Sequence, residues 1–518
     1  MLMIKVGKTD IYYEIDNMTI GRIPSKANMY DNGSDNSLYL GMKSNEEICK
    51  MLCKMFNYSS IDEFSGKQYN MKSYGGIEVL VTTNISGSGQ LQIKFNKNRI
   101  MLEIYNEFLL DSMEDIKLDE IIMVVDFKKN NIRIKKISDF RLWFMKINVA
   151  TVFSGIGAIE QACKKVYGND NVNIVFACDT GERYLTDTKE ELDKQMLDMS
   201  YDEKQAYLKT KYYKNNKRNY VKDSYFANYK ISEKQWYEDI RFLDGKPYKD
   251  KVDLLCGGSP CQSFSVIGRR AGLEDARGTL FYDYARLIEE VKPKVFIFEN
   301  VPGMLSHDNK NTWKVIKEVF ESLKYKIYVK VLNSIDFGIP QDRKRLFIVG
   351  FKDGNDLFEF PKGSNIGNVS MFDFLEPNVA TRHYLGEKGF KFVTNSKYKN
   401  RARVNHKIIQ TEKANQQFNW NGDFVFEEFD PEKHNEEIMN RAYLGDFDGK
   451  RGVIRQLSHR ECLRLMGFPD DFKIVVPNVK AYRQAGNSIV VNVLEAILRS
   501  IDECEEKYNA KIKVSNSI

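Results

Sequence analysis

A cysteine follows a proline on a loop rich in glycine and serine, in the segment GGSPCQSFS at residues 257–265. The apolar run KVDLL before this loop predicts a buried strand, so Cys261 comes just after a strand ends. Ligands of α/β sheets bind at that end of the strands, and backbone N–H groups of such a loop lower the pKa of a thiol from about 8.5. Cys261 is therefore a candidate nucleophile, whereas a purely structural thiol would better suit the strand itself.

An acid and two arginines accompany two further predicted strands. Glu299 ends an apolar run in FENVPG, where a carboxyl group could protonate a ring nitrogen or could simply cap a helix. Arg343 and Arg345 precede the apolar run in QDRKRLFIVG, and strand alternation would place both on one face. These residues can supply a proton and positive charge near the nucleophile, although the arginines also suit a charged strand edge.

The segment FSGIG lies between a predicted strand and a predicted helix. Gly155 and Gly157 would let the backbone approach a ligand closely, next to a helix N-terminus. Asp179 ends the following strand, where a carboxylate can accept hydrogen bonds from ribose hydroxyls. The pair favours a nucleoside cofactor, either a nicotinamide dinucleotide or S-adenosylmethionine. The incomplete G-x-G-x-x-G pattern counts against the dinucleotide.

The elements that must position these residues alternate between strand and helix from residue 147 onward, which predicts an α/β fold with a doubly wound, Rossmann-like sheet. Residues 147–350 form this domain, and the polar residues 186–235 interrupt it as an insertion. Residues 351–450 are irregular and rich in glycine, asparagine and aromatic side chains, and residues 451–518 return to helical spacing.

Residues 1–146 differ in pattern and predict a separate α+β module. Alternating apolar residues predict strands in GGIEVLVTT, QLQIKF and RIMLEIY, and EIIMVVDFKKNNIRIKKI predicts a hairpin. Helical spacing occurs in SNEEICKMLCKMF. No arrangement of residues in this module indicates a chemical activity.

Composition limits the remaining possibilities. The 518 residues carry a net charge of +6, with 42% hydrophobic and 29% charged residues, which fits a folded protein and permits a polyanionic partner. The eight cysteines form no disulfide framework or zinc pattern, so we expect free thiols and no metal. The start of the chain lacks the apolar core of a signal peptide, and no apolar run is long enough to span a membrane. We therefore expect a cytoplasmic protein.

Six motifs occur in one order: FSGIG, SPCQSFS, ENV, QDRKRLFIVG, RQLSHRECLRLMGFPDDF and AYRQAGNSIVVNVLEAI. Together they resemble the cytosine carbon-5 DNA methyltransferase family, over roughly residues 147–500. The combination of Pro-Cys-Gln with Gln-x-Arg-x-Arg is highly specific.

The resemblance implies roles for individual residues. Cys261 would add to carbon-6 of a flipped cytosine, Glu299 would protonate N3, and Arg345 with Arg343 would lie at O2. Asp239 would accept from the adenine amino group of S-adenosylmethionine. The positions that match cofactor contacts are Phe153, Ser154, Gly155, Ile156, Gly157, Asp179, Asp239, Ile240, Pro260, Leu280, Asn487 and Ser488. Thr180 stands where the family often has an aromatic residue, and the spacing from Asp179 to Asp239 is longer than the minimal pattern.

Sequence recognition would fall to residues 351–450, which hold a basic stretch without acids between Lys388 and Lys407. This stretch would contact phosphates, unless it is only a solvated basic face. The implied partner is double-stranded DNA, with a cognate restriction endonuclease acting separately on a monomeric enzyme. The expected DNA contacts are Gln262, Ser265, Arg269, Arg270, Lys397, Lys399, Arg401 and Arg403.

Three alternatives remain. A tRNA cytosine methyltransferase has the same fold, but that branch carries a Cys-Phe-Thr tripeptide, and no Cys-Phe pair occurs in this chain. A catalytically inactive DNA-binding regulator would not need the complete set of Cys261, Glu299 and Arg345. A nicotinamide dehydrogenase would need the full dinucleotide motif and has no use for Pro-Cys-Gln.

Overall fold

The structure is a computed structural model that describes residues 146–259 and 280–515, apart from 215–216, 353 and 364–368. Before residue 146 it describes the backbone of ten strands, and in residues 506–515 it describes the helical backbone alone. The chain forms two compact units, Met1–Phe144 and Met145–Ile518.

The described part of the first unit is a ten-stranded sheet in the order β3-β2-β1-β9-β10-β6-β7-β8-β5-β4. The expected hairpin is present, because β9 and β10 pair antiparallel, with Asn131 opposite Asp126. The expected helix in SNEEICKMLCKMF and the expected strand in RIMLEIY lie outside the described residues. The strands are β1 (Leu2–Lys5), β2 (Ile11–Ile15), β3 (Thr19–Arg22), β4 (Ala27–Asp31), β5 (Ser37–Lys43), β6 (Gln68–Ser73), β7 (Glu78–Ile85), β8 (Gln90–Asn96), β9 (Ile121–Asp126) and β10 (Asn131–Lys136).

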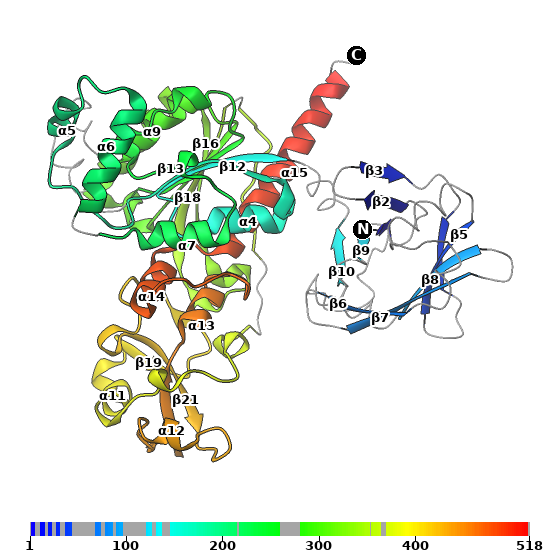
Figure 1. Ribbon diagram of the computed structural model, residues 1–518, viewed down its shortest axis with the longest axis vertical. Coiled ribbons are helices and arrows are strands. Elements are labelled where there is room, and N and C mark those ends of the chain that lie inside the picture. Colours follow the sequence, from blue (N-terminus) through cyan, green and yellow to red (C-terminus); the bar gives the residue numbers. More distant parts are fainter. Residues whose placement is uncertain are drawn as a thin grey trace. The chain divides into compact units, whose positions relative to one another are not determined.

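The second unit is built on a seven-stranded sheet in the order β13-β12-β11-β14-β15-β18-β16 (Figure 1). All neighbours run parallel except β18, which is antiparallel to both β15 and β16. The sheet therefore has the expected doubly wound arrangement, with one reversed strand, β18, between β15 and the edge strand β16. The strands are β11 (Ile147–Val152), β12 (Val172–Cys178), β13 (Trp236–Tyr237), β14 (Leu254–Gly257), β15 (Val295–Asn300), β16 (Lys326–Asn333) and β18 (Lys344–Phe351).

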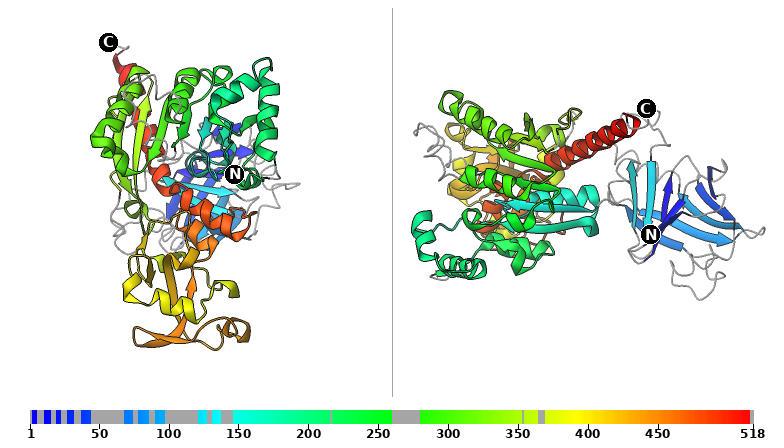
Figure 2. Two further views of the ribbon diagram at one scale, coloured as in Figure 1. Left: turned by 90° about the vertical axis from the view of Figure 1, so that its left-hand side faces the viewer. Right: turned by 90° about the horizontal axis from the view of Figure 1, so that it is seen from above.

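Helices cover both faces of this sheet, as the alternating pattern predicted (Figures 1 and 2). Helix α4 packs against the long C-terminal helix α15, and the hydroxyl of Tyr167 donates to the carboxylate of Asp502 at 2.8 Å between them. None of the described helices has the length and apolar character that crossing a bilayer requires. The helices are α4 (Ala158–Tyr167), α5 (Lys189–Gln195), α6 (Tyr201–Tyr213), α7 (Tyr220–Asn228), α9 (Leu280–Val291), α10 (Asn311–Ser322), α13 (His459–Arg464), α14 (Asn478–Asn487) and α15 (Val491–Ser515).

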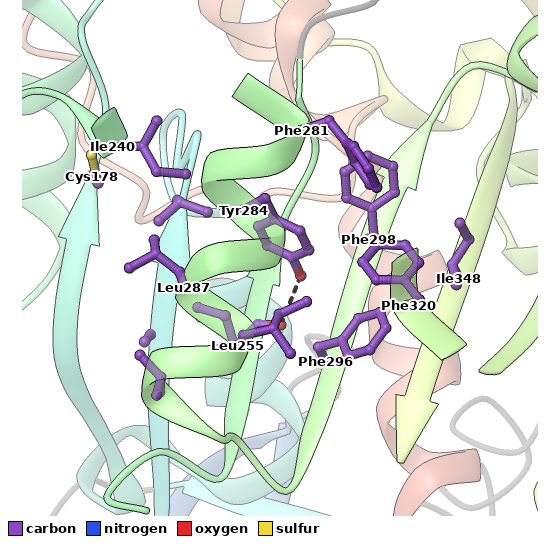
Figure 3. Close-up of a cluster of buried hydrophobic side chains, with 14 of the residues drawn as sticks. Cys178, Ile240, Leu255, Phe281, Tyr284, Leu287, Phe296, Phe298, Phe320 and Ile348 are labelled. Atoms are coloured by element: carbon purple, nitrogen blue, oxygen red, sulfur yellow. Dashed lines mark hydrogen bonds between the residues drawn. The ribbon is translucent and has the colours of Figure 1, made fainter. Parts of the chain in front are cut away.

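The core lies between the central strands and helix α9. Strand β15 is a continuous apolar run whose side chains are buried on both faces, as expected for a strand in the middle of a covered sheet. Tyr284 of α9 is fully buried among aromatic residues such as Phe296 and Phe298, and its hydroxyl donates to the carbonyls of Leu255 and Ile297 (Figure 3). This rigid core fixes the strand ends at which the candidate site forms.

Residues 186–235, expected as an insertion, contain the helices α5, α6 and α7. All three lie in the connection between β12 and β13, which are parallel neighbours and must be joined by a crossover. Capping boxes at Thr188 and Ser200 define where α5 and α6 begin.

Residues beyond β18 form a smaller lobe around a four-stranded sheet in the order β19-β21-β23-β22 (Figure 1). The segment is therefore more regular than expected, and β23 extends the lobe to Gln456, past the expected boundary at residue 450. A second, two-stranded sheet pairs β17 with β20. The elements are β17 (Gln341–Asp342), α11 (Glu387–Val393), β19 (Ala402–Val404), β20 (Ile409–Gln410), β21 (Gly422–Glu428), α12 (Glu436–Met439), β22 (Gly445–Phe447) and β23 (Lys450–Gln456).

Candidate active site

The candidate residues meet at one edge of the seven-stranded sheet. Strands β11, β12, β14 and β15 run parallel and end at this edge, where ligands of such sheets bind. Strand β18 runs antiparallel to β15, with Asn300 opposite Leu346, so it begins at the edge where β15 ends. The reversed strand is the reason that residues at its start face residues at the ends of the others.

The glycine loop after β11 is held in a left-handed conformation. Gly155 has φ 53° and Gly157 has φ 82°. The side-chain oxygen of Ser154 accepts from the backbone N–H of Cys178 at 3.0 Å, which fastens the loop to β12. A Cβ at Gly155 would have no atom within 4 Å, whereas one at Gly157 would lie 2.3 Å from the ring of Tyr229. The loop therefore borders open space at Gly155 and packs closely against the Tyr229 ring at Gly157.

Asp179 joins the glycine loop to the end of β12. Its Oδ2 accepts from the N–H of Gly155 at 2.9 Å, and its Oδ1 accepts from the N–H of Gly181 at 2.7 Å. Burial raises the pKa of the Asp179 carboxyl, and these two hydrogen bonds oppose that rise. Each oxygen keeps acceptor capacity for a further donor, such as a sugar hydroxyl.

The other expected cofactor residues surround this loop. Phe153 and Leu280 pack against the same hydrophobic core, and Ile156 and Ile240 are buried. Asn487 is exposed and donates to Oε1 of Glu182 at 2.8 Å. Ser488 is buried at the end of α14.

Asp239 is buried at the start of a single 3-10 turn, Ile240–Phe242. Its carboxylate accepts from Arg241 and from the hydroxyl of Tyr212, which lies on helix α6. Sequence patterns gave no signal for Tyr212, because only the tertiary fold brings α6 to this position.

Glu299 and Arg345 form an ion pair at the edge. The Nε of Arg345 lies 3.1 Å from Oε1 of Glu299, and both side chains are mostly buried. Burial raises the pKa of the Glu299 carboxyl, while the charges of Arg345 and Arg343 oppose that rise. A carboxyl group with a raised pKa holds its proton at higher pH than an exposed glutamate, which suits proton donation.

Arg343 has a different environment from Arg345. It is buried, and its guanidinium donates to the backbone carbonyls of Glu412, Gly486 and Ser488 at 2.7, 3.1 and 2.6 Å. Burial lowers its pKa to about 9. Through these bonds Arg343 joins the segment at Glu412 to the segment at Gly486 and Ser488. Arg345 is therefore the arginine that forms the ion pair with Glu299, while Arg343 lies close enough to act on the Glu299 carboxyl through its charge.

The loop that carries the candidate nucleophile starts next to Glu299. A Cβ at Gly258 would lie 2.4 Å from the carbonyl oxygen of Glu299, so only glycine fits there. The side-chain amide of Asn300 donates to the carbonyl of Ser259 at 2.9 Å and fixes the start of the loop. Sequence analysis assigned no role to Gly258 or Asn300, although both lie within the quoted motifs.

Several expected residues fall on the part of the chain that the structure does not describe. The nucleophile Cys261 and the expected contacts Pro260, Gln262, Ser265, Arg269 and Arg270 lie outside the described residues. Among the described residues, no group of three or more histidine, cysteine, aspartate or glutamate side chains could hold a metal ion.

The basic stretch of the smaller lobe is mostly exposed. Lys397, Lys399 and Arg401 face solvent, and the guanidinium of Arg401 lies 5.5 Å from the ring centre of Phe392. Arg403 is instead paired with the buried carboxylate of Asp423 at 2.9 Å. Three of the four expected contacts of this lobe are thus accessible to a polyanion.

Comparison with known proteins agrees with this geometry. The family model for C-5 cytosine-specific DNA methylases matches residues 199–503. The chain is 37% identical over 273 residues to the Type II methyltransferase M.HhaI of Haemophilus parahaemolyticus, covering 51% of this chain and 79% of that protein.

The chain belongs to the C-5 cytosine-specific DNA methylase family. It is an enzyme of that class, a DNA (cytosine-5-)-methyltransferase, and its resemblance to the family is confirmed. The methylase is also 35% identical over 296 residues to M.MspI of Moraxella sp, covering 54% of this chain and 62% of that protein. A methyltransferase of Entamoeba histolytica aligns in space with a TM-score of 0.48 and 15% identity, over 69% of this chain and 98% of that one.

Proposed function

We propose that this methylase transfers the methyl group of S-adenosylmethionine to carbon-5 of a cytosine flipped out of double-stranded DNA, through a covalent bond between Cys261 and carbon-6. The ion pair of Glu299 and Arg345, beside the start of the Cys261 loop, is the observation that carries the proposal. A proton donor beside a positive charge would suit polarisation of the polar edge of a pyrimidine.

The residues at the glycine loop fit the proposed cofactor. Gly155 borders open space, and the Asp179 carboxylate beside it can accept from ribose hydroxyls. Phe153, Ile240 and Leu280 would supply apolar surface, and the buried carboxylate of Asp239 would bind the adenine amino group. The bound cofactor supplies an electrophilic methyl group on a sulfonium.

The chain's own residues would activate the cytosine. The thiolate of Cys261 adds to carbon-6 while Glu299 gives a proton to N3, so negative charge does not build up on the ring. Arg345 donates to O2 and strengthens the same polarisation. Carbon-5, now enamine-like, attacks the methyl group, so the carbon–sulfur bond of the sulfonium would break and S-adenosylhomocysteine would leave as a neutral thioether. Loss of the carbon-5 proton to a base then expels the Cys261 thiolate, N3 returns its proton to Glu299, and the aromatic ring is restored.

The smaller lobe would recognise the target sequence. Its exposed Lys397, Lys399 and Arg401 would contact phosphates, which strengthens binding without selecting bases. The relatives named above are Type II methyltransferases. We extend that role to this enzyme, with a separate restriction endonuclease that cuts the same sequence. Sequencing of DNA from cells that express the methylase would locate 5-methylcytosine and define that sequence.

The experiment that tests the mechanism uses DNA in which the target carries 5-fluorocytosine. The unsubstituted enzyme should form a denaturation-resistant adduct, because fluorine replaces the proton whose loss would release Cys261. Cys261→Ser should form no adduct and should not methylate DNA. Methylation of DNA by Cys261→Ser would overturn the proposal. The proposal would also be overturned if the unsubstituted enzyme methylated tRNA but none of the DNA substrates.

A matched control removes a neighbouring thiol. Cys256 lies on β14 and is buried, and burial raises its pKa, so this thiol is a poor nucleophile. Cys256→Ala should keep the adduct.

A further inference from the structure

Helix α6 contacts the residues that follow β13 through several side chains, and one of these contacts is a buried hydroxyl. The Tyr212 hydroxyl, on the last turn of α6, donates to Oδ2 of Asp239 at 2.6 Å. Tyr212 is 3% exposed and Asp239 is 4% exposed, so water cannot replace this bond. The bond links helix α6 to Asp239, the residue at which the adenine amino group is proposed to bind.

The remaining contacts of Asp239 determine how its carboxylate is turned. Oδ2 receives the two shortest bonds, from Tyr212 at 2.6 Å and from Nη2 of Arg241 at 2.7 Å. Oδ1 receives the backbone N–H of Arg241 at 3.0 Å and shares the Nε of Arg241, at 3.1 Å, with Oδ2. The shared Nε contact is the weakest of the set. An N–H group of a ligand could therefore replace the Nε of Arg241 at Oδ1.

The end of α6 is itself held in place by neighbouring groups. The guanidinium of Arg183 lies 5.2 Å from the ring centre of Tyr212, and its Nη2 forms an ion pair with Glu238. Asn219 donates to the same Glu238 carboxylate and to the carbonyl of Asp179, both at 3.1 Å. Tyr212 is therefore fixed relative to the strand ends that carry Asp179 and Asp239.

From this arrangement we infer that Tyr212 is a positioning residue for adenine recognition: its hydroxyl holds Oδ2 of Asp239 so that Oδ1 accepts from the adenine amino group. The inference rests on the proposed cofactor and deepens it. It gives helix α6 a role in selectivity: through Tyr212, α6 would make the cofactor site prefer a purine with an exocyclic amino group.

The test measures binding, with no need for turnover. The full-length chain is titrated by calorimetry with S-adenosylhomocysteine and with the analogue that has hydrogen in place of the 6-amino group. Tyr212→Phe keeps the ring beside Arg183 and removes only the hydroxyl. Its affinity for S-adenosylhomocysteine should fall about five- to tenfold. This loss is smaller than the loss expected when a hydrogen bond to a charged group is removed completely, because Asp239 itself remains. Its affinity for the analogue should change less than about twofold, because only the amino group contacts Asp239.

Tyr207→Phe is the matched control. The hydroxyl of Tyr207, also on α6, donates at 2.7 Å to Gln195 of α5 and contacts no residue of the proposed site. This variant should bind both ligands as the unsubstituted chain does. Thermal melts of both variants would show whether α6 stays folded.

Three outcomes would overturn the inference. Equal losses for both ligands in Tyr212→Phe would assign Tyr212 a general structural role. No change with either ligand would uncouple α6 from the site. Equal affinity of the unsubstituted chain for both ligands would show that Asp239 does not accept a hydrogen bond from the adenine amino group. If that chain bound neither ligand, the proposed cofactor would fail as well, which distinguishes the two conclusions.

Discussion

Arg345 contacts Glu299 because the strand that begins with Lys344 and Arg345 runs opposite to the strand that ends with Glu299 and Asn300. Strand β18 pairs antiparallel with β15, and the Nε of Arg345 lies 3.1 Å from Oε1 of Glu299. A parallel strand in the same place would carry its first residues to the far edge of the sheet. The two residues proposed to polarise the base therefore depend on one reversal of chain direction.

Glu299→Gln should lower turnover severely and leave cofactor affinity nearly unchanged. An amide cannot give a proton to N3, whereas the glycine loop and Asp179 do not involve Glu299. Single-turnover methylation and calorimetry with S-adenosylhomocysteine measure the two quantities. Collapse of cofactor binding in this variant would show that Glu299 is a structural residue. Glu318→Gln on the surface of α10 is the control.

The two arginines of the Gln-x-Arg-x-Arg motif should differ when each is replaced by methionine. Arg343→Met leaves three backbone carbonyls without their donor and should lower the free energy of unfolding by about 3 kcal/mol or more. Arg345→Met should slow methylation with a smaller loss of stability. Denaturant titration and single-turnover kinetics measure both effects, and the reverse pattern would exchange the two roles.

Gly258→Ala should destabilise the enzyme and slow methylation together. The new methyl group would meet the Glu299 carbonyl at 2.4 Å, and backbone cannot yield as a side chain would. Such overpacking costs about 1–3 kcal/mol. Gly303→Ala is the control, because a Cβ at Gly303 has no atom within 4 Å. Thermal melts and methylation rates of both variants decide, and normal behaviour of Gly258→Ala would contradict the close approach.

Glu412→Gln should change how stability depends on pH. Burial raises the pKa of the Glu412 carboxyl to about 8, whereas an unfolded glutamate titrates near about 4.3. Between these values the unfolded chain releases a proton that the folded chain keeps, so the stability present below about pH 4.3 is lost as pH rises toward 8.

Glutamine at position 412 does not titrate. Glu412→Gln should therefore gain stability over the unsubstituted chain as pH rises from 5 to 8, on the order of a few kcal/mol. Thermal melts at the two pH values test this, and a constant difference between the proteins would show that Glu412 is ionised in the fold.

Asp179→Ala should weaken binding of S-adenosylhomocysteine by roughly 1.5–3 kcal/mol, the strength of hydrogen bonds to a charged group. Asp187→Ala, which removes a partner of Lys211, is the control. An unchanged dissociation constant would move the ribose contact to another acid, such as Glu182, which binds Asn487.

The sequence predicted the central strands of the seven-stranded sheet and the motifs at their ends, because apolar runs and glycine loops are local signals. It did not predict β13 or the strands of the smaller lobe. It did not predict which face Arg343 takes: β18 begins at Lys344, so Arg343 lies before the strand and alternation does not apply to it. It also did not show that α5, α6 and α7 all belong to the crossover between β12 and β13, because the pairing of these two strands is a tertiary contact.

The short sheet of β17 and β20 has a mechanical consequence. Gln341 and Asp342 pair with Ile409 and Gln410 of the smaller lobe, directly before the residues that lead to Arg345. Arg343 adds a bond to Glu412 on the lobe side and bonds to Gly486 and Ser488 on the sheet side. The proposed binding of DNA to the smaller lobe would therefore be coupled through these bonds to the backbone next to Arg345, and so to the proposed contact with the base.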